Sequence, residues 1–219
     1  MNATVNNLGE RWSLFQQFMC EIRDVEIQQD RLRFRRNIER MGEIFAYEIS
    51  KVMQHREIQV QTPMGEADGA VLTEQPVLAT ILRAGLPLHR GLLNYFDRAE
   101  NTFISAYRKH EKDSDKFEVE IEYLSSPSVD GKTVILCDPM LATGSSMVLA
   151  YKALLERGTP AKLHVVVVIA AEEGLEMVIK NLPAETTYWV GAIDPELTSS
   201  KYIVPGLGDA GDLAYGAKE

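Results

Sequence analysis

The sequence predicts an α/β fold with a mainly parallel central sheet and helices on both faces. Apolar, β-branched runs recur along the chain, helix-like stretches alternate with them, and no internal repeat or low-complexity tract divides the order. Continuous apolar strands are typical of parallel sheets, because such strands are buried on both faces. We expect one domain over residues 1–219, with an N-terminal helical extension over about 1–55 and a core over about 70–219.

The expected strands and helices follow one another along the chain. Strands are expected at residues 76–82, 102–107, 133–137, 163–171 and 187–193. Helices are expected at residues 87–96, 146–156 and 172–181, and a longer N-terminal helix at 30–53. In the longer segment apolar residues recur at steps of three or four, so one face of that helix should pack against the main body.

Three segments lie outside this alternation. Residues 57–61 alternate polar and apolar side chains before a turn at 62–65, which predicts a short strand or hairpin outside the central sheet. Residues 109–124 are charged and then alternating, as expected of a projecting hairpin; an ordinary solvated excursion and an active-site flap explain it equally well. Residues 202–216 are rich in glycine with apolar anchors, which favours a loop that binds a ligand through its backbone.

Composition limits the classes of function. Hydrophobic residues make up 45% and charged residues 25% of the 219 positions, as is usual for a globular protein. The net charge of -9 argues against broad nucleic-acid binding, and no apolar run approaches the roughly 20 residues that cross a bilayer. The N-terminus does not resemble a secretory signal, and Cys20 and Cys137 cannot supply a disulfide framework. We therefore expect a reducing, cytoplasmic setting with neither membrane nor nucleic acid as a partner.

The segment VILCDPMLATGSS, residues 134–146, is the most informative. An apolar strand ends at Asp138, a short loop follows, and Thr143 to Ser146 open an amphipathic helix. Ligands gather at the carboxyl ends of parallel strands, and the amides and positive dipole of a helix N-terminus suit a phosphate group. Gly144 would let the backbone approach that phosphate, the neighbouring hydroxyls would add donors, and Asp138 would accept hydrogen bonds from sugar hydroxyls.

A plainer interpretation of the TGSS pattern is an ordinary N-cap, which stabilises a helix by about 1 kcal/mol. Taken alone, the four residues favour that interpretation. Other phosphate-binding motifs are missing from the sequence, which has no GxxxxGK[ST] P-loop and no GxGxxG after its first strand. Further motifs elsewhere in the sequence are therefore needed to distinguish a helix cap from a phosphate-binding site.

Three motifs together carry a resemblance to a known family. DPMLATGSS at residues 138–146 resembles the 5-phosphoribosyl 1-diphosphate (PRPP) motif of the type I phosphoribosyltransferases, in the form found in uracil phosphoribosyltransferase, where proline follows the aspartate. ILRAGLPL at 81–88 resembles the family's ILRAG loop, and YIVPGLGDAGD at 202–212 resembles its uracil-binding segment. The resemblance runs in order from about residue 62 to 216 and implies the type I phosphoribosyltransferase fold, with the N-terminal helix, projecting β-hairpin and C-terminal base-binding loop added.

The resemblance implies a role for each matching position. The PRPP-binding residues would be Arg83, Ala84, Gly85, Arg108, Asp138, Pro139, Met140, Leu141, Ala142, Thr143, Gly144, Ser145, Ser146 and Asp209. The uracil-binding residues would be Ile203, Gly208, Asp209 and Ala210. The residues expected to act in catalysis are Asp138, Arg83, Arg108 and Asp209. A planar guanidinium suits bidentate contact with a diphosphate, although an arginine without such a motif is more often a surface side chain.

The implied activity is that of a pentosyl-group transferase in pyrimidine salvage. A uracil nitrogen would displace pyrophosphate from the anomeric carbon of PRPP and give UMP, through a transition state with oxocarbenium character. Positioning and stabilisation of the leaving group would carry the catalysis, since no nucleophile–base pair is evident. Mg²⁺ would arrive mainly on the diphosphate, and no protein metal ligand is expected. The resemblance also implies a homodimer or homotetramer and names GTP as a candidate effector.

The sequence departs from the family pattern at several positions, and two alternatives stay open. Ser145 stands where the family usually has a second glycine, Leu213 stands where it usually has an arginine, and the region after Arg108 differs from the commoner pattern. These differences bear on assembly and regulation more than on the reaction. The alternatives are a phosphoribosyltransferase for another base, which conflicts with YIVPGLGDAGD, and a non-enzymatic uridine-nucleotide-binding regulator, which would be expected to carry a basic RNA-binding face.

Overall fold

The computed structural model describes the backbone of residues 3–110 and 117–217. The strands of its central sheet are β1 (Thr4–Asn7), β4 (Val77–Leu82), β5 (Glu100–His110), β6 (Phe117–Ser125), β7 (Thr133–Cys137), β8 (Met140–Leu141), β9 (Lys162–Ala171) and β10 (Thr187–Asp194). They lie in the order β1-β10-β9-β7-β4-β5-β6, with β8 beside β9. The neighbouring strands are parallel except for β5 and β6, so the α/β class and the mainly parallel sheet are confirmed.

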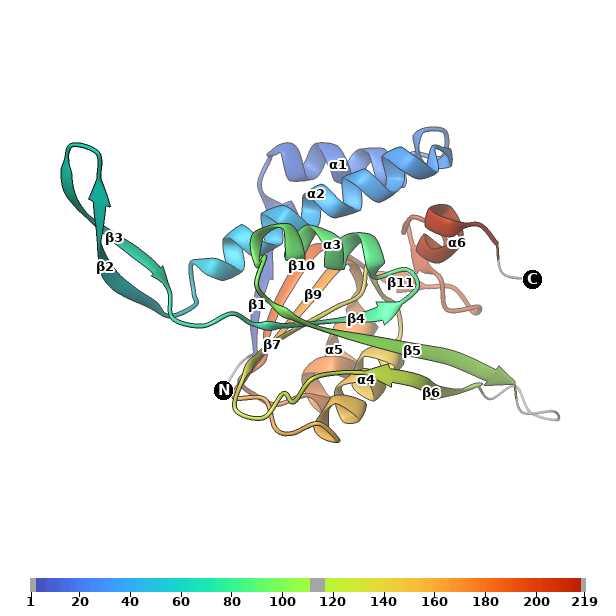
Figure 1. Cartoon of the computed structure of the whole chain (residues 1–219). Coiled ribbons are helices and arrows are strands. Elements are labelled where there is room, and N and C mark those ends of the chain that lie inside the picture. Colours follow the sequence, from blue (N-terminus) through green and yellow to red (C-terminus); the bar gives the residue numbers. More distant parts are fainter. Residues whose placement is uncertain (1–2, 111–116, 218–219) are drawn as a thin grey trace.

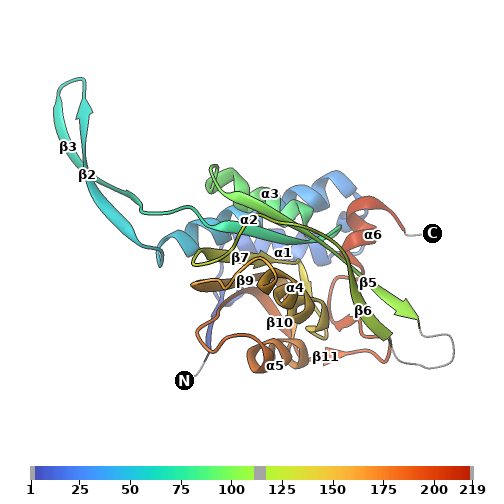
Figure 2. The same cartoon turned by 60° about the horizontal axis from the view of Figure 1, so that its bottom comes forward.

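Helices cover both faces of this sheet (Figure 1). They are α1 (Leu14–Arg23), α2 (Arg31–Ser50), α3 (Leu86–Tyr95), α4 (Ser145–Leu155), α5 (Glu172–Asn181) and α6 (Ala210–Tyr215), with short 3₁₀ helices at Leu8–Glu10 and Ile27–Gln29. Figures 1 and 2 show α1, α2 and α3 on one face of the sheet and α4 and α5 on the other. The expected helices therefore take up the expected places in the chain. α2 begins after Asp30, whose side chain accepts a hydrogen bond from the Arg33 amide.

The sheet separates two apolar cores, and β9 contributes to both. Val166 and Val168 pack with the residues under α1, α2 and α3, whereas Val165 and Val167 pack with those under α4 and α5. Nine of the ten residues of β9 are buried, because successive side chains point to opposite and equally covered faces. This is the physical reason for the unbroken apolar run in the sequence.

The N-terminal part of the chain contains elements that sequence periodicity did not predict. β1 pairs with β10 at one edge of the sheet, with Thr4 opposite Thr187 and Asn7 opposite Val190. Three of its four residues, TVNN, are polar and none of the four is buried, so they show no apolar strand signal. α1 follows and is capped by Ser13, which accepts a hydrogen bond from the Phe15 amide.

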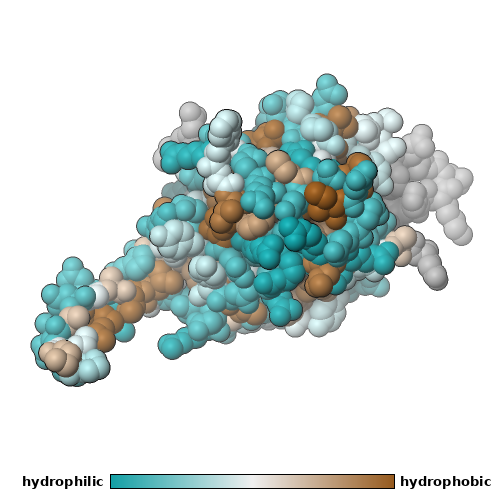
Figure 3. All heavy atoms as spheres, turned by 90° about the horizontal axis from the view of Figure 1, so that it is seen from above, coloured by the Kyte–Doolittle hydropathy of each residue, from teal (hydrophilic) through white to brown (hydrophobic). Residues whose placement is uncertain are grey.

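Two hairpins project from the body of the protein (Figures 1 and 2). β2 (His55–Thr62) and β3 (Gly65–Leu72) form a separate antiparallel ribbon, so the hairpin expected outside the central sheet is confirmed and is longer than predicted. Apolar side chains are exposed along it, including Val60, Met64 and Val71, and Figure 3 shows this hydrophobic surface on the projecting ribbon. The predicted 109–124 hairpin coincides with the outer part of β5 and β6, and its residues 111–116 lie outside the described residues.

The strand register brings the predicted functional segments together at the carboxyl ends of the central strands. Thr80 of β4 lies opposite Cys137 of β7, which in turn lies opposite Val166 of β9. The loops that follow β4 and β7 are therefore neighbours. A small antiparallel pair, β11 (Glu196–Leu197) and β12 (Ile203–Val204), leads the C-terminal segment to the same place. Among the described residues, no helix combines the length and apolar character needed to cross a membrane.

Candidate active site

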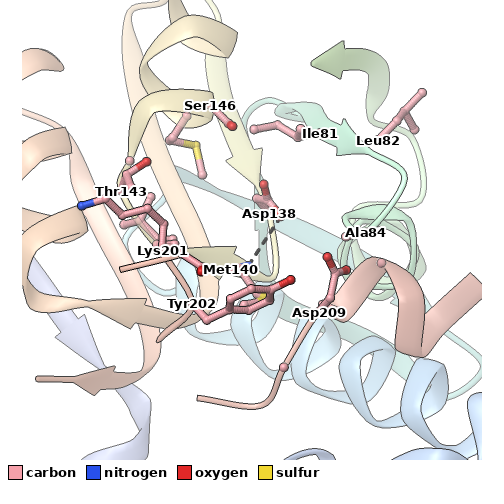
Figure 4. Close-up of a pocket in the computed structure, with 18 residues that line it drawn as sticks. Ile81, Leu82, Ala84, Asp138, Met140, Thr143, Ser146, Lys201, Tyr202 and Asp209 are labelled. Carbon is pink, nitrogen blue, oxygen red and sulfur yellow. Dashed lines mark hydrogen bonds between the residues drawn. The ribbon is translucent and has the colours of Figure 1, made fainter. Parts of the chain in front are cut away.

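A cavity of about 490 Å³ lies where the ends of β4 and β7 meet the C-terminal segment (Figure 4). Its lining residues are Ile81, Leu82, Ala84, Asp138, Met140, Leu141, Ala142, Thr143, Gly144, Ser146, Met147, Ser200, Lys201, Tyr202, Gly208, Asp209, Ala210 and Gly211. Three stretches contribute, and they correspond to the three motifs of the sequence. Below, residues 138–146 are called the strand-end turn and residues 203–210 the C-terminal loop.

Asp138 begins the strand-end turn directly after β7. Its amide donates to the Val166 carbonyl oxygen at 3.1 Å, which extends the pairing of β7 with β9 by one residue. Its carboxylate Oδ1 accepts from the Met140 amide at 3.5 Å, the contact drawn in Figure 4. Burial raises the pKa of Asp138 to about 7; the Met140 amide opposes this rise, and the nearby charge of Asp209 adds to it. The cavity thus holds a carboxyl group that titrates near neutrality.

The strand-end turn leads into α4 through Gly144. This residue has φ of 81° and occupies the N-cap position of the helix. A Cβ atom here would lie 2.9 Å from the Gly174 carbonyl oxygen and 3.0 Å from Val178 Cγ1, so α5 packs directly against the turn. The Ser145 amide is directed at Thr143 Oγ1 at 3.4 Å. The first amides of α4 face the cavity end of the helix, where they have no intrahelical acceptor.

The C-terminal loop forms another wall of the cavity. Asp209 is the N-cap of α6, and its carboxylate Oδ1 accepts from the Asp212 amide at 3.0 Å. A Cβ at Gly211 would lie 3.1 Å from Asp209 Oδ1 and 3.8 Å from Ala84 Cβ, so this end of the loop runs against the turn after β4. Figure 4 shows Asp138 and Asp209 on different elements around the same cavity, which Tyr202 also lines.

The two predicted arginines are placed differently. Arg83 Nη2 donates to Asp212 Oδ1 at 3.1 Å and to the Gly216 carbonyl oxygen at 2.6 Å, so its guanidinium is directed to the end of α6. Gly85 packs tightly behind it, since a Cβ there would lie 2.1 Å from Thr80 Oγ1. The side chain of Arg108 lies outside the described residues. Roles for both arginines at a diphosphate remain predictions.

The structure brings most of the predicted binding residues together. Those that line the cavity are Ala84, Asp138, Met140, Leu141, Ala142, Thr143, Gly144, Ser146, Gly208, Asp209 and Ala210. The other described predicted residues, Arg83, Gly85, Pro139, Ser145 and Ile203, lie beside it rather than in its lining. Ile203 is 4% exposed and packs in the core, so only its backbone could serve a ligand. The binding roles of all these residues remain predictions.

Sequence reasoning missed several lining residues. They are Ile81, Leu82, Met147, Ser200, Lys201, Tyr202 and Gly211. Four of them lie inside the quoted motifs, and the other three, Met147, Ser200 and Lys201, flank a motif by one or two positions, so this adjacency was the available signal. Lys201 lies in a turn just before β12 that no pattern in the sequence indicated. It is a non-glycine residue with φ of 65°, a backbone conformation that is uncommon for such residues.

Comparisons with known proteins agree with this geometry. The family model described as uracil phosphoribosyltransferase matches residues 11–217. A curated protein named uracil phosphoribosyltransferase from Porphyromonas gingivalis is 56% identical over 214 residues, covering 98% of this chain and 99% of that protein. One of the same name from Pyrococcus furiosus is 37% identical over 203 residues, covering 91% of this chain and 85% of that protein.

Solved structures extend the comparison to the fold. A protein from Aquifex aeolicus matches with a TM-score of 0.84 and 31% identity, covering 97% of this chain and 98% of that one. A hypoxanthine phosphoribosyltransferase from Staphylococcus aureus matches with a TM-score of 0.50 and 18% identity over 73% of this chain and 74% of that one. The second likeness concerns the fold alone.

Proposed function

Because the chain belongs to the uracil phosphoribosyltransferase family, we propose that it transfers the phosphoribosyl group of PRPP to uracil, giving UMP and pyrophosphate. One observation carries the proposal on the structural side. The strand-end turn and the C-terminal loop, 60 or so residues apart in sequence, line a single cavity of about 490 Å³. That volume is within the range of small-molecule sites.

The strand-end turn is the natural place for the phosphoribosyl group. The N-terminus of α4 offers amides and a positive dipole end to the 5-phosphate, and Thr143 and Ser146 offer hydroxyls. Asp138, at the end of β7, would accept hydrogen bonds from the ribose hydroxyls in its ionised form. These contacts hold the sugar without a covalent bond to the protein.

The C-terminal loop would hold the base on the other side of the sugar. Gly208, Asp209 and Ala210 line the cavity, and their backbone groups would pair with the oxygens and ring nitrogens at a uracil edge. Ile203 would contribute through its backbone. With base and sugar held on facing walls, a ring nitrogen of uracil would attack the anomeric carbon in line as pyrophosphate departs.

The leaving pyrophosphate would be stabilised by the loop after β4. Ala84 lines the cavity there, and Arg83 and Arg108 are the cations that we propose for the diphosphate. For Arg83 this requires the guanidinium to leave Asp212 and the Gly216 carbonyl, to which it donates here. The side chains of Arg83 and Asp212 are 34% and 41% exposed, so a diphosphate can replace this carboxylate as the partner of the guanidinium at small cost.

We further propose that Mg²⁺ arrives with PRPP. The cavity presents two carboxylates, Asp138 and Asp209, whose oxygens suit this ion, while the side chains that the structure describes include no cluster of three or more metal-ligating groups. The residues therefore fit an ion that keeps several waters and is held mainly by the substrate. When bound, Mg²⁺ would neutralise charge on the diphosphate.

Assembly, effector and location complete the proposal. The β2–β3 ribbon, with Val60, Met64 and Val71 exposed, is a plausible contact between copies, which supports a homodimer or homotetramer. GTP is kept as a candidate effector. The two cysteines are unpaired, which is compatible with the proposed cytoplasmic setting.

A single assay tests the activity. The protein is mixed with PRPP, Mg²⁺ and one base at a time, and nucleotide and pyrophosphate are measured. We expect UMP and pyrophosphate in equal amounts with uracil. AMP or GMP alone would instead assign a phosphoribosyltransferase for another base, and binding of UMP without turnover would assign a nucleotide-binding regulator. Repeating the uracil reaction with GTP tests the effector.

A further inference from the structure

An ion pair outside the cavity connects distant parts of the chain. Arg23 is the last residue of α1 and Asp194 is the last residue of β10. Arg23 Nη1 donates to Asp194 Oδ2 and Nη2 donates to Asp194 Oδ1, both at 2.8 Å. The Asp194 side chain is 6% exposed and that of Arg23 is 23% exposed. This is a bidentate pair that is largely withdrawn from water.

The same pair holds both backbone polar groups of Gly206. The Gly206 amide donates to Asp194 Oδ2 at 2.8 Å, and the Gly206 carbonyl oxygen accepts from Arg23 Nη1 at 3.0 Å. Gly206 has φ of 61°, and a Cβ there would lie 2.0 Å from the Ile203 carbonyl oxygen. The loop is therefore fixed at this residue by a specific backbone shape and by two charge-assisted hydrogen bonds.

Gly206 lies two residues before Gly208 and three before Asp209, which line the cavity. On its other side the loop is tied by β11 and β12, a ladder of only two residue pairs. Burial of Asp194 would raise its pKa, but the hydrogen bonds from Arg23 and Gly206 and the charge of Arg23 lower that pKa overall. The carboxylate thus stays ionised and available to the loop over the neutral range.

We propose that Arg23 and Asp194 are positioning residues for the base: through Gly206 they set where the C-terminal loop presents its backbone groups. This rests on the proposed function, in which that loop reads uracil. The N-terminal helix α1 thereby acts on substrate selection although none of its residues lines the cavity within the described part of the chain. The strand-end turn makes no contact with the pair among the hydrogen bonds of the described residues, so the PRPP contacts proposed for that turn should be separable from it, with Asp209 as the one residue expected to serve both substrates.

The test compares Arg23→Ala with Arg33→Ala by steady-state kinetics in both substrates. Arg33 is the matched control, because it forms a bidentate pair with Glu21 of α1 at 2.9 and 2.7 Å and has its partners away from the loop. We expect Arg23→Ala to raise KM for uracil roughly tenfold or more while KM for PRPP changes less than about twofold, since small misplacements of binding groups are costly. Arg33→Ala should leave both KM values near those of the wild type.

Conservative variants keep the test decisive if Arg23→Ala does not fold. Arg23→Lys keeps the charge but cannot span both Asp194 oxygens and the Gly206 carbonyl, so its KM for uracil should be intermediate. Asp194→Asn keeps an acceptor for the Gly206 amide and should also raise KM for uracil selectively. Equal KM values for uracil in these variants and the wild type, or a parallel rise for PRPP, would overturn the inference. Failure of the wild-type protein to form UMP would instead contradict the proposed function itself.

Discussion

The strand-end turn and the C-terminal loop face the same cavity but are built in different ways. The turn joins β7 to α4, so its shape follows from two regular elements and from α5 packed against Gly144. The loop lies between a two-pair ladder and the six-residue helix α6, and it is held at Gly206 by side chains from α1 and β10. The comparison teaches that the wall proposed for the sugar phosphate is fixed mainly by the elements that adjoin it, whereas the wall proposed for the base also depends on a distant helix.

The largest effect should come from the carboxylate at the turn. Asp138→Ala should lower kcat by about 10²–10³-fold, because it removes hydrogen bonds that strengthen as charge develops on the ribose. The free energy of unfolding should change little or rise, because a carboxyl group with a pKa of about 7 is costly to ionise in the fold. Initial rates of UMP formation and thermal unfolding check this, with the exposed Asp68→Ala as control. Near-normal turnover in Asp138→Ala would contradict the proposal that the ribose binds at this turn.

Gly144→Ala should damage the turn itself. The variant needs a positive φ at an L-residue and places Cβ 2.9 Å from the Gly174 carbonyl oxygen. We expect a loss of about 1–3 kcal/mol in the free energy of unfolding and a rise in KM for PRPP. Gly69→Ala is the matched control, since its Cβ would have 3.8 Å to the nearest atom. If KM for uracil rose instead, the assignment of the two walls would be reversed.

Gly206→Ala should damage the loop and spare the turn. A Cβ 2.0 Å from the Ile203 carbonyl oxygen forces the backbone to move, which weakens both hydrogen bonds to the Arg23–Asp194 pair. KM for uracil should rise about tenfold with KM for PRPP nearly constant. Equal changes in both constants would show that the two regions act as one unit.

The titration of Asp138 sharpens the comparison further. With a pKa of about 7, the carboxylate form rises steeply between pH 6 and 8 in the free protein. If that form binds the ribose, kcat/KM for PRPP should increase about tenfold over this range. Asp138→Asn provides the baseline, because it retains the pH dependence that comes from PRPP alone. Identical profiles for the two proteins would exclude a role for this ionisation.

The raised pKa of Asp138 also makes stability depend on pH, and stability should fall as pH rises, whereas activity should increase. The folded protein binds the Asp138 proton more tightly than the unfolded chain, so the free energy of unfolding should fall as pH rises from about 4 to about 7. Asp138→Asn should show a smaller fall, measured by denaturant unfolding at several pH values. A wild-type curve parallel to that of the variant would contradict the raised pKa.

The smallest effect is expected at Ser145. Its hydroxyl oxygen lies 3.2 Å from Thr143 Oγ1 and contributes nothing to the cavity lining of the described residues, so Ser145→Gly should change kcat/KM less than about twofold. A large change would show that the family's usual glycine and this serine shape the turn differently.

Sequence patterns predicted the sheet better than its edges. The apolar runs of β7 and β9 could be recognised as buried strands in the sequence, because both faces of these strands are covered and successive positions are therefore apolar. β1 gave no such signal, since its pairing with β10 uses backbone hydrogen bonds and leaves polar side chains outside. α6 was also missed, because a six-residue helix with Gly211 inside it has too few turns to show a period.

The site was predictable where chemistry is local and unpredictable where it is not. Asp138 and Gly144 stand six positions apart in one motif, and their places follow from a strand end and a helix start. The hydrogen bond of Arg83 to Asp212, and those of Arg23 to Asp194 and Gly206, each join residues more than 120 positions apart. Such pairings are set by the fold, so no spacing rule could reveal them. The domain boundaries and the individual binding roles stay predictions.

The edge strand β1 has a consequence for how the protein is made. β1 is synthesised well before its partner β10, because Thr4 lies opposite Thr187. Until the N-terminus returns to that edge, β10 presents unpaired amides and carbonyls that another nascent chain can bind. A bulky fusion placed just before Thr4 should therefore lower the yield of refolded protein.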